Sequence, residues 1–199
     1  MKLDDLHTPC LVLELGILKR NLARMADAVA RHPGLKLRPH MKTAKSLAVA
    51  ALAAPDHGPI TVSTVAEARY FAGGGYRDQI YAVGITPQKL DAIAALNAQG
   101  NDVKIITDDA DVASAIAAHP GILPTLIEVD CGEGRGGIAP DSDKLAEIAQ
   151  HLGTKCAGIM THAGHSYAER SEDGMRKVAE AERAGAVLAA ERLRGMGIT

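Results

Sequence analysis

The stretch ITVSTVAEARYFAGGGYRDQIYAVG, residues 60–84, decides the fold. It opens with a β-branched run at 60–63, continues through a helical segment at 65–74 that ends on glycines, and closes with a second apolar run at 79–84. Glycine just after a helical segment is a normal stop signal. Two strands joined by a helix of this length form a right-handed βαβ unit in a parallel sheet. The stretch therefore predicts an α/β protein.

The same alternation of strands and helices continues on both sides of this stretch. Further strands are expected at 10–15, 35–42, 103–107, 125–130 and 155–162. Further helices are expected at 16–31, 43–54, 87–97, 109–118, 141–151 and 171–194. Asp108 is placed to cap the helix that follows it. Two architectures compete: a doubly wound open sheet, and a (β/α)8 barrel of which the visible strands would be only a part.

Length and charge exclude several classes of protein. The 199 residues suit one domain, and the formal net charge of −2 lacks the basic excess of a dedicated nucleic-acid binder. The sequence has no apolar run of about 18 residues, and its polar start has no signal-peptide core. We therefore expect a cytoplasmic protein without nucleic-acid or membrane partners. The three cysteines are far apart and favour buried, reduced thiols: Cys10, Cys131 and Cys156.

The segment LKLRPHMKTAK, residues 35–45, carries the first candidate functional residues. If it is a strand, its side chains alternate between two faces. One face is apolar: Leu35, Leu37, Pro39 and Met41. The other face is basic: Lys36, Arg38, His40 and Lys42. Two interpretations remain, an edge strand with one solvated face or a basic face that points into a barrel and needs an anionic partner or a ligand.

Lys42 is the member of this basic face that is best placed for chemistry. It stands at the C-terminal end of the expected strand, where the catalytic residues of barrels gather. Like charge from Arg38 and His40 favours its neutral amine, which is the form of lysine that can form an imine.

The segment TLIEVDCGEGRGGIAP, residues 125–140, contains a glycine pattern that formally matches a dinucleotide-binding fingerprint. A Rossmann site is disfavoured, because Asp130 at the end of the expected strand would repel a pyrophosphate and no acidic residue ends the next strand. Arg135 lies inside the loop and could reach an acceptor on a ligand. The alternative is a flexible surface loop with an exposed arginine.

The segment MTHAGHSY, residues 160–167, brings two histidines after a strand. His162 and His165 are three residues apart and could bind a metal, although no partner carboxylate stands at a fixed spacing. Histidines satisfied in the core, or in contact with a ligand without metal, are the alternatives. Ser63 and Thr64, after the expected strand at 60–63, indicate on their own only a turn and a helix cap.

Taken together, RPHMKTAK, VSTVAEA, EVDCGEGRGGIAP and THAGHSY resemble the pyridoxal-phosphate enzymes grouped as D-threonine aldolase and D-serine dehydratase, of the alanine-racemase-like fold. The resemblance covers almost the whole chain, including the opening TPCLVLELGILKRNL. It implies an α/β (β/α)8 TIM-type barrel in which 10–15 lies outside the barrel, with a C-terminal β domain. Residues 1–199 would then be an incomplete pyridoxal-phosphate-binding barrel domain with six of its strands.

The resemblance also implies roles for single residues. Lys42 matches the lysine that forms an imine with pyridoxal 5'-phosphate, and Arg135 matches the arginine beside the pyridine nitrogen of that cofactor. Tyr167 matches a tyrosine that lines the cofactor, and His162 sits at the preceding strand end. Ser63 falls where relatives often place a glutamine near the phenolic oxygen of the cofactor. Relatives that use a divalent metal bind it through the C-terminal domain, so no metal ligand can be named here.

The activity implied by the resemblance is a lyase reaction on β-hydroxy D-amino acids, by a protein that is a homodimer at full length. Cleavage of the D-threonine aldolase type, to glycine and an aldehyde, is the leading hypothesis. A D-serine dehydratase and an amino-acid racemase are alternatives within the family. A non-catalytic pyridoxal-phosphate-binding homeostasis protein is an alternative of another class. A third class is a phosphate-sugar barrel aldolase or a metal hydrolase with His162 and His165 as ligands.

Overall fold

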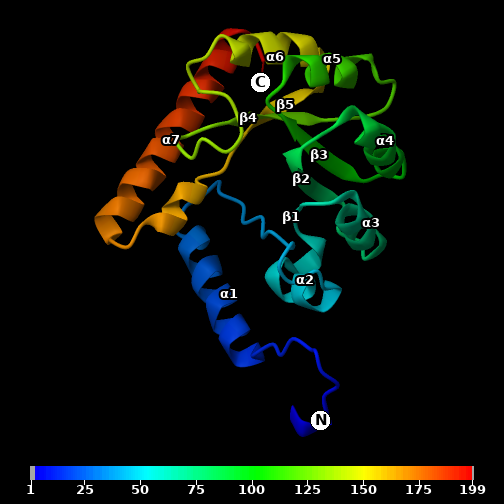
Figure 1. The fold of residues 1–199 in the computed structure, drawn as a ribbon, viewed down its shortest axis with the longest axis vertical. Helices are drawn as coiled ribbons and strands as arrows, with labels where there is room; N and C mark the ends of the chain where they lie inside the picture. Colours follow the sequence, from blue (N-terminus) through cyan, green and yellow to red (C-terminus); the bar gives the residue numbers. More distant parts are fainter. Residues whose placement is uncertain (1–2, 199) are drawn as a thin grey trace.

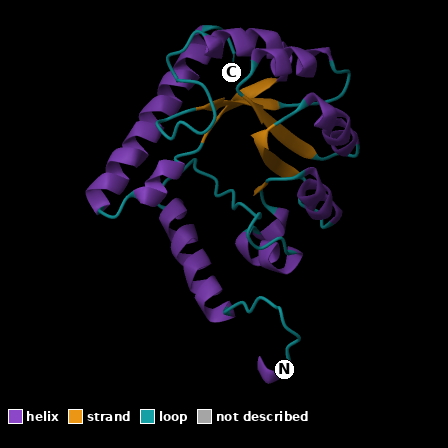
Figure 2. Cartoon of the chain, in the orientation of Figure 1, coloured by secondary structure: helices purple, strands orange, loops and turns teal. Residues whose placement is uncertain are grey.

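The computed structural model describes residues 3–198, which fold around one parallel sheet (Figures 1 and 2). Its five strands lie in the order in which they occur along the chain, and each pairs in parallel with the strand before it. The strands are β1 (Ile60–Val62), β2 (Asp78–Gly84), β3 (Asp102–Thr107), β4 (Thr125–Val129) and β5 (Cys156–Thr161). The predicted α/β fold with a parallel sheet is confirmed.

The helices that follow the strands cover the outside of the curved sheet, whereas the first two helices precede β1 and the first of them lies away from the sheet (Figure 1). The helices are α1 (Leu15–Ala30), α2 (Leu47–Ala53), α3 (Val65–Gly73), α4 (Leu90–Ala98), α5 (Ala110–Ala118), α6 (Lys144–Leu152) and α7 (Glu172–Gly195). Short 3-10 turns lie at Leu3–Asp5, Pro55–His57, Pro87–Lys89, Gly153–Lys155 and Gly164–Ala168. No helix within 3–198 is long and apolar enough to cross a membrane.

Side-chain caps fix where several helices begin. Ser46, Thr64, Asp109 and Ser171 each accept a hydrogen bond from a backbone N–H in the first turn of their helix. Such caps satisfy donors that have no partner within the helix. The expectation that Asp108 caps α5 is wrong, since Asp109 takes that place and leaves the Asp108 carboxylate free for another partner.

The core lies between the sheet and the helices. Ile60, Ile105 and Ile127 of the strands are fully buried and belong to one cluster with Phe71 and Ile148 of the helices. Burying an aliphatic side chain of this size contributes about 1.5–3 kcal/mol. The three cysteines were expected to be buried, and this holds only in part. Cys131 is buried, Cys156 is half-buried and Cys10 is exposed.

The expectation of a strand at 10–15 is wrong. Residues 10–14 belong to no strand, and Leu15 already begins α1. Leu11 is 100% exposed, and Val12 and Leu13 are more than half exposed. The apolar composition of this stretch fits a strand, but the part of the chain described by the structure offers it no neighbour with which to pair.

The expectation of a strand at 35–42 is also wrong, although one strand-like contact remains. His40 forms a single parallel bridge to Thr61, with hydrogen bonds from Met41 N–H to the Thr61 carbonyl at 2.8 Å and from Thr61 N–H to the Pro39 carbonyl at 2.9 Å. Pro39 has no N–H to donate, and the chain turns at once after Met41, so the ladder cannot extend. Lys42 therefore stands in a turn beside the end of β1.

The two expected faces of this segment hold only in part. Met41 is buried, whereas Leu35 is 63% exposed. Arg38 does point toward the sheet, but its guanidinium donates to Asp78 Oδ1 at 2.8 Å and to the carbonyls of Ile60 and Asp78. Its charge is thus paired with that of Asp78, a residue distant in sequence.

Candidate functional site

The carboxyl ends of the strands meet at one edge of the sheet, and the candidate residues lie along it. Ser63 follows β1, Asp108 follows β3, Asp130 follows β4 and His162 follows β5. Lys42 joins them because the bridge from His40 to Thr61 holds its turn against β1. In parallel α/β sheets this is the edge at which ligands bind.

Lys42 is held through its backbone by His40. Its N–H donates to His40 Nδ1 at 3.3 Å, and the other ring nitrogen of His40 lies 3.3 Å from Ser63 Oγ. The side chain of Lys42 is exposed, and within 3–198 its ammonium has no hydrogen-bond or ion-pair partner. The turn therefore presents a free primary amine at the sheet edge.

Glu67 supports this turn from the first turn of α3. It is buried, accepts a hydrogen bond from Ser63 N–H at 2.8 Å and pairs with Lys45 Nζ at 3.3 Å. Thr64 Oγ1 in turn accepts from Glu67 N–H at 3.0 Å. This is a close variant of a capping box, and the spacing Thr64-x-x-Glu67 in the sequence was a signal that could have found it.

The glycine loop after β4 is built around two carboxylates. Asp130 accepts from the N–H groups of Gly132 and Gly134 at 2.9 and 3.1 Å, and these hydrogen bonds hold the pKa of Asp130 below its usual value. Asp108 Oδ2 accepts from Gly137 N–H at 2.8 Å. The backbone donors of the loop are thus turned toward protein carboxylates, which agrees with the rejection of a pyrophosphate site.

Arg135, His162 and Tyr167 meet around Glu133, a residue that the sequence did not single out. Glu133 Oε2 lies 2.7 Å from His162 Nδ1, and its other oxygen lies 3.7 Å from Arg135 Nη1. The hydrogen bond from His162 lowers the pKa of Glu133. The ring of Tyr167 stands edge-on to His162 with centroids 6.2 Å apart. Nothing in the local sequence marks this carboxylate, because its partner is 29 residues away.

The Glu128 carboxylate on β4 feels the charges of Asp108 and of the residues around Glu133. Its pKa is raised, first by burial and then by the neighbouring Asp108 carboxylate, while Arg135 and His162 oppose the shift. His162 also acts electrostatically on His40. The structure thus brings the five candidate residues to one edge in two groups. Lys42 and Ser63 lie beside His40, and Arg135 and His162 lie beside Glu133, with Tyr167 against His162.

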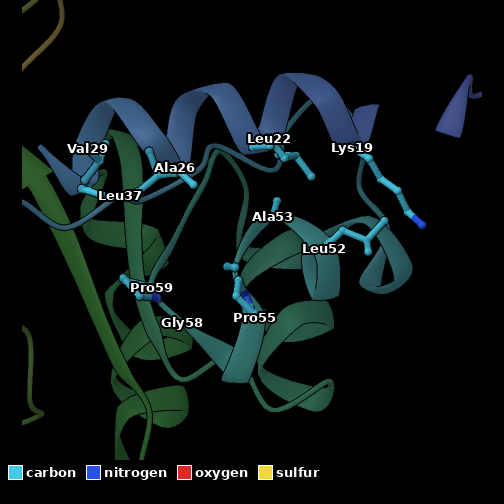
Figure 3. A pocket seen from close by; sticks show the side chains of 13 residues that line it. Lys19, Leu22, Ala26, Val29, Leu37, Leu52, Ala53, Pro55, Gly58 and Pro59 are labelled. Atoms are coloured by element: carbon cyan, nitrogen blue, oxygen red, sulfur yellow. The ribbon is translucent and has the colours of Figure 1, made fainter. Parts of the chain in front are cut away.

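Two other features do not belong to this edge. A cavity of about 620 Å³ lies between α1 and α2 (Figure 3) and, apart from Lys19, is lined by apolar residues and glycine. Gly58 and Pro59 in its wall precede β1, so it opens at the opposite end of the strands from Lys42. For metals, residues 3–198 hold no cluster of three or more ligating side chains.

The family model that describes the alanine racemase N-terminal domain matches residues 13–198. The chain belongs to this family. An alanine racemase N-terminal domain was the fold expected from the resemblance, and that expectation is confirmed.

Individual relatives of this alanine racemase N-terminal domain are lyases. A D-threo-3-hydroxyaspartate dehydratase of Delftia is 40% identical over 97% of the chain and 53% of its own length. Its crystal structure superimposes with a TM-score of 0.93 over 98% of the chain. A 3-hydroxy-D-aspartate aldolase of Paracoccus denitrificans is 35% identical over 74% of the chain and 39% of its own length. The chain thus spans about half the length or less of these relatives.

The residues at the sheet edge of this alanine racemase N-terminal domain fit pyridoxal phosphate. Lys42 supplies an unpaired amine, and Arg135 supplies a cation that is more than half exposed. His165, after β5, has its Nδ1 buried without a hydrogen-bond partner among the described residues, so this nitrogen is left to bond with a group that is not part of the described chain. Ser63 Oγ has no second partner in the same part of the chain.

Proposed function

We propose that this chain forms the cofactor-binding part of a pyridoxal-phosphate-dependent lyase that acts on β-hydroxy D-amino acids. The free amine of Lys42 at the carboxyl edge of the sheet carries the proposal. What distinguishes Lys42 from the other exposed lysines is its place, because the bridge from His40 to Thr61 holds its turn against the carboxyl end of β1. The names of the relatives point to the same class of reaction.

The roles of the side chains follow from their contacts. Lys42 would hold the cofactor and afterwards take or return a proton at the substrate, with its peptide fixed by His40. Arg135 keeps its charge at every accessible pH and would hold a ring nitrogen in its unprotonated state. Tyr167 and His162, which stand edge-on to one another, would line the cofactor. When bound, pyridoxal phosphate draws electrons from the bonds at the substrate Cα.

The substrate we propose is a 3-hydroxy-D-aspartate. The relatives named for that amino acid are 40% and 35% identical to the chain, whereas a D-threonine aldolase of Arthrobacter is 31% identical. The D-threonine aldolase type of cleavage expected from the sequence remains the second candidate, and dehydration of D-serine the third. A protein that only racemises amino acids, or that binds the cofactor without turnover, would not be a lyase.

The products of the full-length protein loaded with pyridoxal phosphate separate these functions. Cleavage of the Cα–Cβ bond of 3-hydroxy-D-aspartate releases glycine and glyoxylate, whereas dehydration releases oxaloacetate and ammonia. D-Threonine, D-serine and D-alanine are the comparison substrates. Turnover of a β-hydroxy D-amino acid supports the lyase. Binding without turnover of any of them contradicts it, and racemisation alone identifies a racemase.

Borohydride reduction of the loaded protein tests the site itself. Peptide mass mapping should find pyridoxal attached to Lys42. Lys36 and Lys45 are the nearby lysines, and Lys45 is already paired with Glu67. A label on either of them, or a Lys42→Ala protein that keeps the label and the turnover, would show that the site is assigned to the wrong residue.

A further inference from the structure

His40 stands between the two residues that the proposed function places beside the ligand. Its Nδ1 lies 3.3 Å from the backbone nitrogen of Lys42, and its Nε2 lies 3.3 Å from Ser63 Oγ. A backbone N–H can only donate, so Nδ1 must be the nitrogen without a proton. The proton of the neutral ring is then on Nε2 and points at the hydroxyl oxygen of Ser63.

This tautomer determines what Ser63 can do. Because its oxygen accepts from His40, its own hydroxyl proton is left for another acceptor. Its backbone N–H is held by Glu67 Oε2 at 2.8 Å, so the residue is fixed from two sides. The Ser63 hydroxyl is therefore oriented as a donor toward an oxygen of a ligand held at Lys42.

The charges around His40 favour the neutral ring. Burial is the first cause that lowers its pKa, and the ammonium of Lys42 on the same segment is the second. Glu67 from α3 and the Thr61 carbonyl from β1 oppose them, and His162 after β5 lowers the pKa further. The balance leaves His40 harder to protonate than a free histidine.

We propose that His40 is a positioning residue that acts in its neutral, Nε2-protonated form, fixing the peptide of Lys42 and turning the Ser63 hydroxyl into a donor for the ligand. The inference rests on the proposed function of Lys42. Protonation of His40 removes the acceptor of the Lys42 N–H, so the turn that presents the Lys42 amine is no longer held by the ring. As the pH falls and His40 takes up a proton, the rate at which Lys42 captures a carbonyl ligand should therefore decrease.

Two substitutions separate the two contacts of the ring. In His40→Asn the amide oxygen replaces Nδ1 as an acceptor, but the donor to Ser63 is lost. In His40→Gln the amide nitrogen replaces Nε2 as a donor, but the acceptor of the Lys42 N–H is lost. Ser63→Ala removes the hydroxyl and keeps His40. His32→Asn, at an exposed position after α1, is the control.

The first measurement needs no cofactor. Nuclear magnetic resonance of the full-length protein with 15N-labelled histidine reports the tautomer and the titration of each ring, and the signal lost in His40→Gln identifies His40. We expect a neutral ring with its proton on Nε2 near neutral pH. A proton on Nδ1, or a charged ring at that pH, would overturn the inference, and a signal lost in both His40→Gln and His40→Asn confirms that it belongs to His40.

The second measurement is the rate at which Lys42 captures pyridoxal phosphate across the pH range. The adduct is trapped with borohydride, and its position is mapped by mass spectrometry. The decrease in rate in acid should be present in the unmodified protein, His32→Asn and Ser63→Ala, and absent from both His40 variants. Capture by His40→Gln near neutral pH should be about tenfold slower, the equivalent of one net hydrogen bond. If the rate of capture falls in acid in both His40 variants as well, the inference on His40 is overturned and the proposed function stands. If Lys42 captures no pyridoxal phosphate at any pH, the proposed function is overturned too.

Discussion

Gly137 is the residue of the glycine loop that tolerates a side chain least. Its φ is +92°, and a Cβ there would lie 2.7 Å from the Asp130 nitrogen and 2.8 Å from the Val129 carbonyl carbon. Both are backbone atoms that cannot move aside, because Asp130 N–H donates to the Ile138 carbonyl at 2.9 Å.

We expect Gly137→Ala to lower the free energy of unfolding by about 3 kcal/mol or more. The matched control is Gly134→Ala, where φ is +69° and no atom lies within 4 Å of the added Cβ. That change should cost only the backbone strain, about 1–2 kcal/mol. Urea denaturation measures both, and equal losses would show that the close approach at Gly137 contributes nothing.

Glu128 and Glu133 should respond to pH in opposite directions. Burial raises the pKa of Glu128, so the folded state holds its proton more tightly than the unfolded state and the ionised form destabilises the protein as the pH rises above the usual value near 4.5. Glu128→Gln should therefore raise the urea midpoint at alkaline pH and lose that effect in acid.

The hydrogen bond from His162 lowers the pKa of Glu133, so the ionised form of Glu133 stabilises the folded state, and this contribution is lost as the pH falls through the lowered pKa. Glu133→Gln should lower the urea midpoint near neutral pH and leave it unchanged in strong acid. If the two variants show the same pH dependence, the environments assigned to these carboxylates are wrong.

At the scale of elements, Asn97 links α4 to β3 and to the loop before β4. Its amide donates to the carbonyls of Val103 and Ile122 at 3.1 and 2.9 Å, and its oxygen accepts from Val103 N–H at 2.8 Å. Asn97→Ala would leave buried backbone groups without partners, at a cost of about 2–4 kcal/mol. Asn101→Ala is the control, since Asn101 donates only to the Leu96 carbonyl and should cost about 1 kcal/mol.

The elements also show how far the sequence predicts the structure. Strands β1 to β5 and the helices after them could be placed from alternation, caps and glycine stops, because these signals are local. The pairing of Arg38 with Asp78, of Asp108 with Gly137 and of His162 with Glu133 could not, because each joins segments at least 29 residues apart. Apolar composition also suggested a strand at 10–15, which needs a neighbour that no local pattern reveals.

At the scale of the whole molecule, the sheet has two unequal edges. The bridge at His40 partly covers β1, whereas within 3–198 β5 pairs only with β4. We expect the isolated 199-residue chain to be of low stability and without turnover of 3-hydroxy-D-aspartate, D-threonine or D-serine. Amide hydrogen exchange should be faster in β5 than in β3, which has a partner on each side. Ready turnover of any of these substrates by the isolated chain would contradict this prediction.

The order of the strands also governs how the protein emerges from the ribosome. Each strand from β2 to β5 pairs with the strand synthesised just before it, so each new strand finds one of its partners already made. Translation adds about 5–20 residues per second, whereas a helix forms within about 1 μs and small domains fold in about microseconds to seconds. The nascent chain can therefore fold one βα unit at a time from its N-terminal side, and a pause in translation between units leaves a smaller sheet with the same pairing.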